Sequence, residues 1–367
     1  MDGNSAAAVS APTDPTVANA KERLYRLLRQ ASRTFALSIE GLPVGLRDEV
    51  ATSYLLLRVS DYFEDHESLA TEQKIRLLEL WHAVLSDVAG SNCAGSNCAG
   101  SDCAGSNCRS HQAFAEALGA IPVDPDDAED AVARQWRFLI ATLTGFDPKA
   151  TRVIVDRVRE TTLGMARWQA KGPCVEDEHD LDEYMHYVAG LVGYLVTDLF
   201  SLHYRTVADR RHRLMPLARE FGLALQTVNV LRGLRKDFDR GWVFVPGSFC
   251  AAYGMMLTDL FSASHRSRAM RVVGDMIVKG EHHLQSGLSY ISLIPRHLHR
   301  LRLACMWPLL FAAKTVAVSR NNPQVLCGEV KIGRETVKKI MRDSTLWGWS
   351  NAWLTSYTRR LLVSPAV

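Results

Sequence analysis

Residues 53–69 read SYLLLRVSDYFEDHESL, a stretch in which a polar stripe interrupts an apolar helical pattern. Its polar residues recur at spacings of four, three and four: Tyr54, Arg58, Asp61 and Asp65. These spacings place the side chains on one face of an α-helix. Burying carboxylates among leucine and valine is costly unless a cation pairs with them. The stretch therefore predicts a helix with a cation site along one face.

Magnesium fits the oxygen donors of this stretch. Asp61 and Asp65 are four residues apart and can reach one cation, and Glu64 lies at the same edge. Magnesium prefers oxygen ligands and takes further ligands from water and phosphate. A solvated face with an Arg58–Asp61 or Arg58–Asp65 ion pair would give the same pattern, so this stretch alone leaves both interpretations open.

A second stretch, residues 224–246, reads ALQTVNVLRGLRKDFDRGWVFVP. Four of its residues share one helical face at spacings of three, four and four: Gln226, Asn229, Gly233 and Asp237. Its cations could bind phosphate oxygens: Arg232, Arg235, Lys236 and Arg240. Ordinary charge pairs along a helix are the alternative. The glycine in mid-helix counts against that alternative, since it costs about 1 kcal/mol relative to alanine.

The third informative stretch, residues 180–200, reads DLDEYMHYVAGLVGYLVTDLF. Tyr187, Gly190 and Tyr194 fall on one predicted helical face, with Gly193 beside them. Two glycines in an apolar helix permit close approach by another group. That group is either a neighbouring helix or an apolar ligand.

Helical periodicity continues through most of the chain and predicts a single all-α domain over residues 21–364. Ten segments carry it: 25–39, 49–62, 73–88, 130–143, 150–168, 181–203, 214–238, 270–294, 300–318 and 334–362. Residues 242–245 could form one short strand. Residues 1–20 are rich in alanine, serine, proline and threonine, which predicts disorder. A five-residue AGSNC repeat predicts a flexible insertion at about residues 89–110.

Composition limits the classes of partner. The chain has 367 residues, of which 43 are basic and 40 acidic, and this balance argues against nucleic acid. No run of about 18 apolar residues is evident, so no membrane span is predicted. The eight cysteines fit a reducing compartment, and we expect a cytoplasmic protein without a secretory signal. Composition gives no oligomeric state.

From Leu24 to Val318 the chain resembles the squalene/phytoene synthase family. The resemblance rests on residues 32–35 (SRTF), on Tyr54 with residues 58–65, on residues 184–193 (YMHYVAGLVG), and on the stripe that ends at Asp237. It implies an isoprenoid synthase fold of the class I terpenoid type, a helical bundle around a central cavity. It also implies a prenyl diphosphate substrate and magnesium, up to a cluster of three ions.

Roles for individual residues follow from the resemblance. The metal ligands would be Asp61, Glu64, Asp65, Asn229 and Asp237. The diphosphate would contact Ser32, Arg33, Arg58, Gln226, Arg232 and Lys236. The aromatic faces of Tyr54, Tyr187 and Tyr194 would stabilise an allylic cation.

The second acidic motif departs from the family pattern, which runs Asn-x-x-Arg-Asp-x-x-Glu-Asp. Here Gly233 replaces the first aspartate and Lys236 replaces the glutamate. The remaining pattern resembles the magnesium motif of class I terpene cyclases. We therefore expect a sesquiterpene cyclase that closes a humulene-type ring from farnesyl diphosphate without NADPH, similar to fungal squalene-synthase-like cyclases. A head-to-head synthase making a squalene- or phytoene-like product, and an inactive scaffold, are the alternatives.

Overall fold

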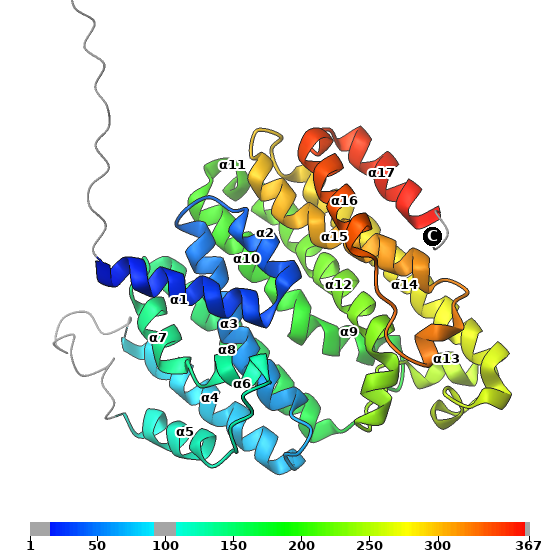
Figure 1. Cartoon of the computed structure of the whole chain (residues 1–367), viewed down its shortest axis with the longest axis horizontal. Helices are drawn as coiled ribbons and strands as arrows, with labels where there is room; N and C mark the ends of the chain where they lie inside the picture. Colours follow the sequence, from blue (N-terminus) through cyan, green and yellow to red (C-terminus); the bar gives the residue numbers. More distant parts are fainter. Residues whose placement is uncertain (1–14, 92–107, 364–367) are drawn as a thin grey trace, which may run out of the picture.

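The computed structural model describes residues 15–91 and 108–363, and Figure 1 shows its helices packed into one bundle. The helices are α1 (Pro15–Ala31), α2 (Arg33–Glu40), α3 (Leu46–Asp65), α4 (Thr71–Ser91), α5 (Arg109–Gly119), α6 (Ala128–Ala133), α7 (Trp136–Thr144), α8 (Pro148–Lys171), α9 (Glu178–Met185), η1 (His186–Gly190), α10 (Leu191–His203), α11 (Arg205–Ala208), α12 (Arg211–Asp239), α13 (Gly247–Ala251), η2 (Leu257–Asp259), η3 (Ala263–His265), α14 (Arg266–Leu293), α15 (His299–Ser319), η4 (Pro323–Leu326), α16 (Arg334–Trp347) and α17 (Asn351–Val363).

The all-α prediction is confirmed. In the described part of the chain, the β contact is one isolated bridge between Cys174 and Val243. The short strand expected at residues 242–245 is therefore reduced to a single paired residue. The core is a continuous apolar cluster that draws residues from α1 through α17.

Several predicted segments divide where the backbone leaves the α-helical path. Segment 25–39 divides at Ser32, whose extended backbone (φ −160°) ends α1 and whose hydroxyl accepts a hydrogen bond from the Phe35 backbone N–H. Segment 181–203 contains a π-helical turn at His186–Gly190. Segment 334–362 divides after Trp347. Each break sets a new direction for the side chains that follow it.

The two predicted flexible regions lie largely outside the described residues. Residues 15–20, the end of the predicted disordered segment, are helical in α1. Residues 92–107 hold most of the predicted insertion and are not described. On either side of that gap, α4 extends to Ser91 and α5 begins at Arg109.

Glycines bring η1 and α10 unusually close to α12. A Cβ atom on Gly193 would lie 2.1 Å from the Ala218 carbonyl oxygen. A Cβ atom on Gly222 would lie 2.2 Å from the Ala189 carbonyl oxygen. Gly193 therefore contacts a neighbouring helix, one of the two interpretations given for it, and it also lines the cavity described below.

Two helical stretches are long and apolar enough to cross a membrane, by length and composition alone: Glu178–His203 and His299–Ser319. This differs from the expectation that no such run exists. The second, α15, is mostly buried inside the bundle.

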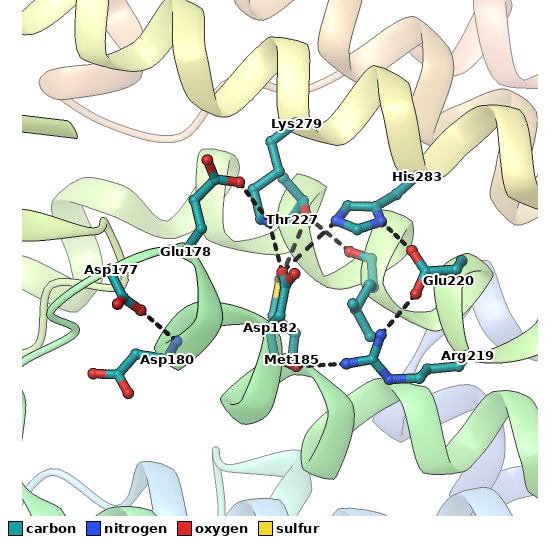
Figure 2. A network of polar contacts seen from close by, with 11 residues as sticks. Asp177, Glu178, Asp180, Asp182, Met185, Arg219, Glu220, Thr227, Lys279 and His283 are labelled. Atoms are coloured by element: carbon teal, nitrogen blue, oxygen red, sulfur yellow. Dashed lines mark hydrogen bonds and ion pairs between the residues drawn. The ribbon is translucent and has the colours of Figure 1, made fainter. Parts of the chain in front are cut away.

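A polar network fastens α9 to α12 and α14, as Figure 2 shows. We call it the α9–α14 network, and it consists of Glu178, Asp182, Arg219, Glu220, Lys279 and His283. The Lys279 ammonium lies 2.6 Å from an Asp182 carboxylate oxygen and 3.2 Å from one of Glu178. Nδ1 of His283 lies 2.7 Å from a Glu220 carboxylate oxygen. Lys279 and His283 are buried, whereas their acidic partners remain partly exposed, so the network joins three helices at the edge of the bundle.

Candidate functional site

A cavity of about 450 Å³ runs between α2, α3, α10, α12, α14 and α15. Its interior is lined by aliphatic and aromatic side chains, among them Leu57, Val192 and Phe221. One end carries the polar residues of α3 and α12. The cavity thus combines an apolar interior with a charged mouth.

The α3 side of the mouth carries the residues of the first stripe. Tyr54, Arg58, Asp61, Glu64 and Asp65 all line the cavity. An Arg58 guanidinium nitrogen donates to an Asp61 carboxylate oxygen at 2.7 Å, and the same guanidinium contacts the carboxylate of Glu129 on α6.

The carboxyl groups on this side are held in an unfavourable environment. Burial, together with the nearby Asp65 charge, raises the pKa of Asp61 to about 6 despite its Arg58 partner. Burial and the charges of Asp65 and Asp61 raise the pKa of Glu64 well above its usual range. Such shifts mean that the charged carboxylates are destabilised, chiefly by their burial, and that a further cation would stabilise them.

The α12 side contributes the second stripe. Gln226, Asn229, Lys236 and Asp237 line the cavity, and Gly233 lies among them. The Asn229 side-chain amide donates to the Gln226 side-chain oxygen at 3.2 Å. The Asp237 carboxylate lies over Gly233. A Cβ atom on that glycine would be 3.0 Å from Asp237 Oδ2. Burial raises the pKa of Asp237.

Arg240 joins the two sides. Its guanidinium lies 2.9 Å from an Asp65 carboxylate oxygen and 2.5 Å from an Asp237 carboxylate oxygen. Sequence reasoning counted Arg240 as a cation of its stretch but not as a site residue. The bridge depends on how closely α3 and α12 approach, which spacing along one helix does not reveal. We call Arg58, Asp61, Glu64, Asp65, Asp237 and Arg240 the α3–α12 cluster.

Three residues predicted to bind diphosphate lie outside the cavity wall. Ser32 caps α2, and Arg33 is exposed at the start of that helix. Phe35 from the same helix lines the cavity instead. Arg232 lies in an outer recess beside the mouth, where its guanidinium pairs with Glu329. Lys236 borders both the cavity and this recess.

Tyr187 and Tyr194 also lie outside the cavity wall, which corrects their predicted position. The Tyr187 ring packs where a Cβ atom on Gly164 of α8 would stand, 2.3 Å away. The Arg157 guanidinium of α8 lies 5.2 Å from the centre of the Tyr194 ring. Both rings therefore face α8, as their predicted shared face allows, and the position at the cavity that the family resemblance implied for them is not observed.

Tyr184 is the tyrosine of this segment that lines the cavity, and sequence reasoning missed it. Its ring stacks on Phe244 with centroids 4.4 Å apart. Burial, and then the Glu64 charge, raise its pKa well above the usual range. Tyr54 of α3 also lines the cavity, and the centroid of its ring lies 5.6 Å from that of Phe35. Deeper in the cavity wall, the Tyr290 hydroxyl lies 2.9 Å from that of Thr197.

A separate group could hold a metal ion by spacing alone. Donor atoms of Asp177, His179 and Asp180 all lie within 4.8 Å of one another at the start of α9. Figure 2 shows Asp177 accepting the backbone N–H of Asp180, a helix cap at 3.0 Å. Asp180 also pairs with Lys171 at 2.7 Å. These contacts account for both carboxylates.

Comparison with known proteins assigns the chain to a family. The model of the squalene/phytoene synthase family matches residues 28–336. The chain belongs to this family. The squalene/phytoene synthase match spans α2 to α15 completely, so it includes both acidic stripes and the cavity.

Named relatives are squalene synthases. The human squalene synthase is 28% identical over 324 residues, which cover 88% of this chain and 69% of that protein. The squalene synthase of Schizosaccharomyces pombe is 29% identical over 336 residues, which cover 90% of this chain and 66% of that protein.

Solved structures share the fold. The complex of TcSQS with the ligand E5700 superposes with a TM-score of 0.74 at 24% identity, covering 93% of this chain and 91% of that chain. A dehydrosqualene synthase in complex with ligand gives a TM-score of 0.62 at 17% identity, covering 94% of this chain and 98% of that chain.

Proposed function

We propose that this chain is a magnesium-dependent enzyme that ionises farnesyl diphosphate and cyclises the resulting cation to a humulene-type sesquiterpene. The observation that carries the cyclisation step is the composition of the α12 side of the mouth. Among the described α12 residues that line the cavity, Asp237 supplies the one carboxylate. Gly233 and Lys236 occupy the positions where the family pattern has acids. We infer that this smaller set of acids suits a site that ionises one diphosphate better than a site that binds two in turn.

The donor set supports magnesium as the cofactor. Carboxylate oxygens from Asp61, Glu64, Asp65 and Asp237 and the amide oxygen of Asn229 surround the mouth, and magnesium prefers such ligands. The raised pKa values of Asp61, Glu64 and Asp237 show that burial destabilises their charged forms, which a bound cation would offset. When bound, magnesium would neutralise charge that develops on the departing diphosphate.

The chain's own residues would perform the remaining tasks. Arg58, Lys236 and Arg240 place positive charge at the mouth, where it favours a departing diphosphate. The apolar wall excludes water that would otherwise quench an allylic cation. The faces of Tyr54 and Tyr184 offer π density to that cation. The released diphosphate is the base that we propose for the final proton loss.

Head-to-head condensation is the second candidate, and the comparisons favour it over cyclisation. The relatives and the solved structures described above are squalene or dehydrosqualene synthases. The intact α3 stripe fits this reaction equally well. Condensation of two farnesyl units would give a C30 product, with NADPH as reductant if the product is squalene.

One incubation separates the two reactions. Purified chain is incubated with farnesyl diphosphate and magnesium, with and without NADPH, and products are identified by gas chromatography–mass spectrometry. A C15 hydrocarbon formed without NADPH supports cyclisation. A C30 product overturns it in favour of condensation. Loss of all product with C10, C15 and C20 substrates would favour the inactive scaffold.

A double substitution tests the α12 observation directly. Gly233→Asp with Lys236→Glu restores both acids, and a shift of product from C15 towards C30 is expected. The matched control is Arg235→Glu, which adds an acid to the same helix but leaves Gly233 and Lys236 unchanged. An identical product from the double variant and the natural chain would remove the basis for the cyclase proposal.

A further inference from the structure

Arg240 occupies the space between the two acidic stripes. Its side chain is 17% exposed and leaves the C-terminal end of α12. It contacts the carboxylates of Asp65 and Asp237, and it also donates to the Asp65 backbone carbonyl at 3.3 Å. Among the ion pairs of the described residues, this is the one that links the carboxylates of Asp65 and Asp237.

The bridge solves an electrostatic problem. Asp65 and Asp237 come from different helices and face the same space, so their charges repel one another. A guanidinium has a planar fork of donors and can bind two carboxylates at once. In the structure as it stands, Arg240 therefore provides the positive charge that brings the ends of α3 and α12 together.

A divalent cation shared by these carboxylates would compete with Arg240. A displaced guanidinium that is mostly buried needs another anion, because an unpaired buried charge is costly. Two neighbouring arginines already have carboxylate partners: Arg58 pairs with Asp61 and Glu129, and Arg232 pairs with Glu329. Diphosphate oxygens at the mouth would supply the anion that Arg240 needs.

We propose that Arg240 couples metal binding to diphosphate binding. Its guanidinium pairs with Asp65 and Asp237 until a diphosphate arrives, and then donates to the diphosphate oxygens instead. This positioning role rests on the proposed function, because it concerns the metal and diphosphate of the same site. It makes a specific statement about free energies: each ligand raises the affinity for the other. Metal alone binds weakly, because it must displace Arg240 with no anion to receive it.

The test measures Mn²⁺ binding instead of turnover. Free Mn²⁺ is followed by electron paramagnetic resonance in titrations of the full chain, with and without inorganic diphosphate. A protein-free titration corrects for the Mn²⁺–diphosphate complex in solution. In the natural chain, diphosphate should raise Mn²⁺ affinity about tenfold or more, a coupling typical of linked sites.

Arg240→Gln should have two opposite effects. Mn²⁺ alone should bind about tenfold more tightly, because the competing guanidinium is gone, and the enhancement by diphosphate should be smaller than in the natural chain, since only direct contact between metal and diphosphate remains. The matched control is Arg205→Gln, which removes an exposed arginine paired with Asp209 at 2.9 Å and should leave both affinities unchanged. Equal or weaker Mn²⁺ binding by folded Arg240→Gln overturns the proposal.

Arg240→Lys keeps the test informative if the glutamine variant fails to fold. Lysine preserves the charge but cannot span two carboxylates with a planar fork. Its Mn²⁺ affinity without diphosphate should fall between those of the natural chain and Arg240→Gln, and no change from the natural chain overturns the proposal. If the natural chain binds no Mn²⁺ under either condition, the metal assignment of the proposed function fails as well. If it binds Mn²⁺ and the variants match it, the coupling role alone fails.

Discussion

The α3–α12 cluster and the α9–α14 network are both charged groups between helices, yet their environments act in opposite directions. In the α9–α14 network, hydrogen bonding to His283 lowers the pKa of Glu220 to about 2. In the α3–α12 cluster, burial raises the pKa of Asp61 to about 6. The network pairs three acids with three basic side chains, whereas the cluster sets four acids against two arginines.

This contrast separates a finished structural contact from a site that requires a ligand. In the network, the Glu220 carboxylate is stabilised in its charged form by the partners it already has. In the cluster, Asp61, Glu64 and Asp237 are destabilised in that form, so they gain from a cation that enters. The same residue types therefore serve stability in one place and binding in the other, and the direction of the pKa shift distinguishes them.

The largest expected effect comes from Asp61→Asn in the cluster. Product formation from farnesyl diphosphate should fall by at least about a hundredfold, since even outer contacts of a metal site often cost that much. Thermal unfolding at pH 7 should stay the same or move to higher temperature, because a strained carboxylate is removed. The control is Asp156→Asn, an exposed carboxylate on α8. Near-normal turnover by Asp61→Asn would show that Asp61 is not a metal ligand.

Lys279→Met in the α9–α14 network should lower stability and leave metal binding unchanged, the opposite of Asp61→Asn. Removing a buried cation leaves the partly exposed Asp182 without its 2.6 Å partner and should destabilise the fold by about 2 kcal/mol. Denaturant titration measures the change, and Lys338→Met on exposed α16 serves as control. Mn²⁺ affinity of the folded variant should match that of the natural chain. A loss of Mn²⁺ binding without loss of stability would contradict the separation of the two regions.

Stability should respond to pH with opposite signs in the two regions. The folded pKa of Glu220 is depressed from 4.5 to about 2, so its stabilisation is present above pH 4.5 and lost as pH falls towards 2. Allowing for solvent screening, it should amount to about 2 kcal/mol. The folded pKa of Asp61 is raised from 3.8, so its ionisation lowers stability as pH rises from about 4 to 6.

Two variants measure these contributions. The unfolding free energy of Glu220→Gln, compared with the natural chain, should show a deficit at pH 6 that shrinks towards pH 3. That of Asp61→Asn should show a relative gain that grows over pH 4 to 6. Parallel pH profiles for both variants would mean that the two regions do not differ in the way described.

The smallest effect tests the corrected tyrosine. Tyr184→Leu should lower product formation about tenfold, the loss expected when one cation–π contact disappears from a dry site. Tyr187→Leu is the matched control and should leave turnover within about twofold, because its ring faces α8. A larger loss of product formation for Tyr187→Leu than for Tyr184→Leu would support the original prediction for Tyr187.

The parts that sequence could predict are those on uninterrupted helices. Along α3 and α12 the 3.6-residue period holds, so the two predicted polar faces, that of Asp61 on α3 and that of Asp237 on α12, do line one cavity. Their roles as metal ligands stay predictions. The parts that sequence missed depend on breaks or on contacts between helices. The turn at Ser32 turns Arg33 outward, and the bridge made by Arg240 needs two helices in place.

The π-helical turn at His186–Gly190 also limits how this segment can change in length. Each residue of an α-helix advances the side-chain direction by about 100°. Deleting one residue within the turn would let the helix run on as a regular α-helix, and everything after it would rotate relative to α9. Val192 and Val196 would then leave the cavity wall, and Asp198 would lose Arg157 and Arg211. A deletion within residues 186–190 would therefore change the cavity wall itself, and an alignment gap there would indicate a different cavity.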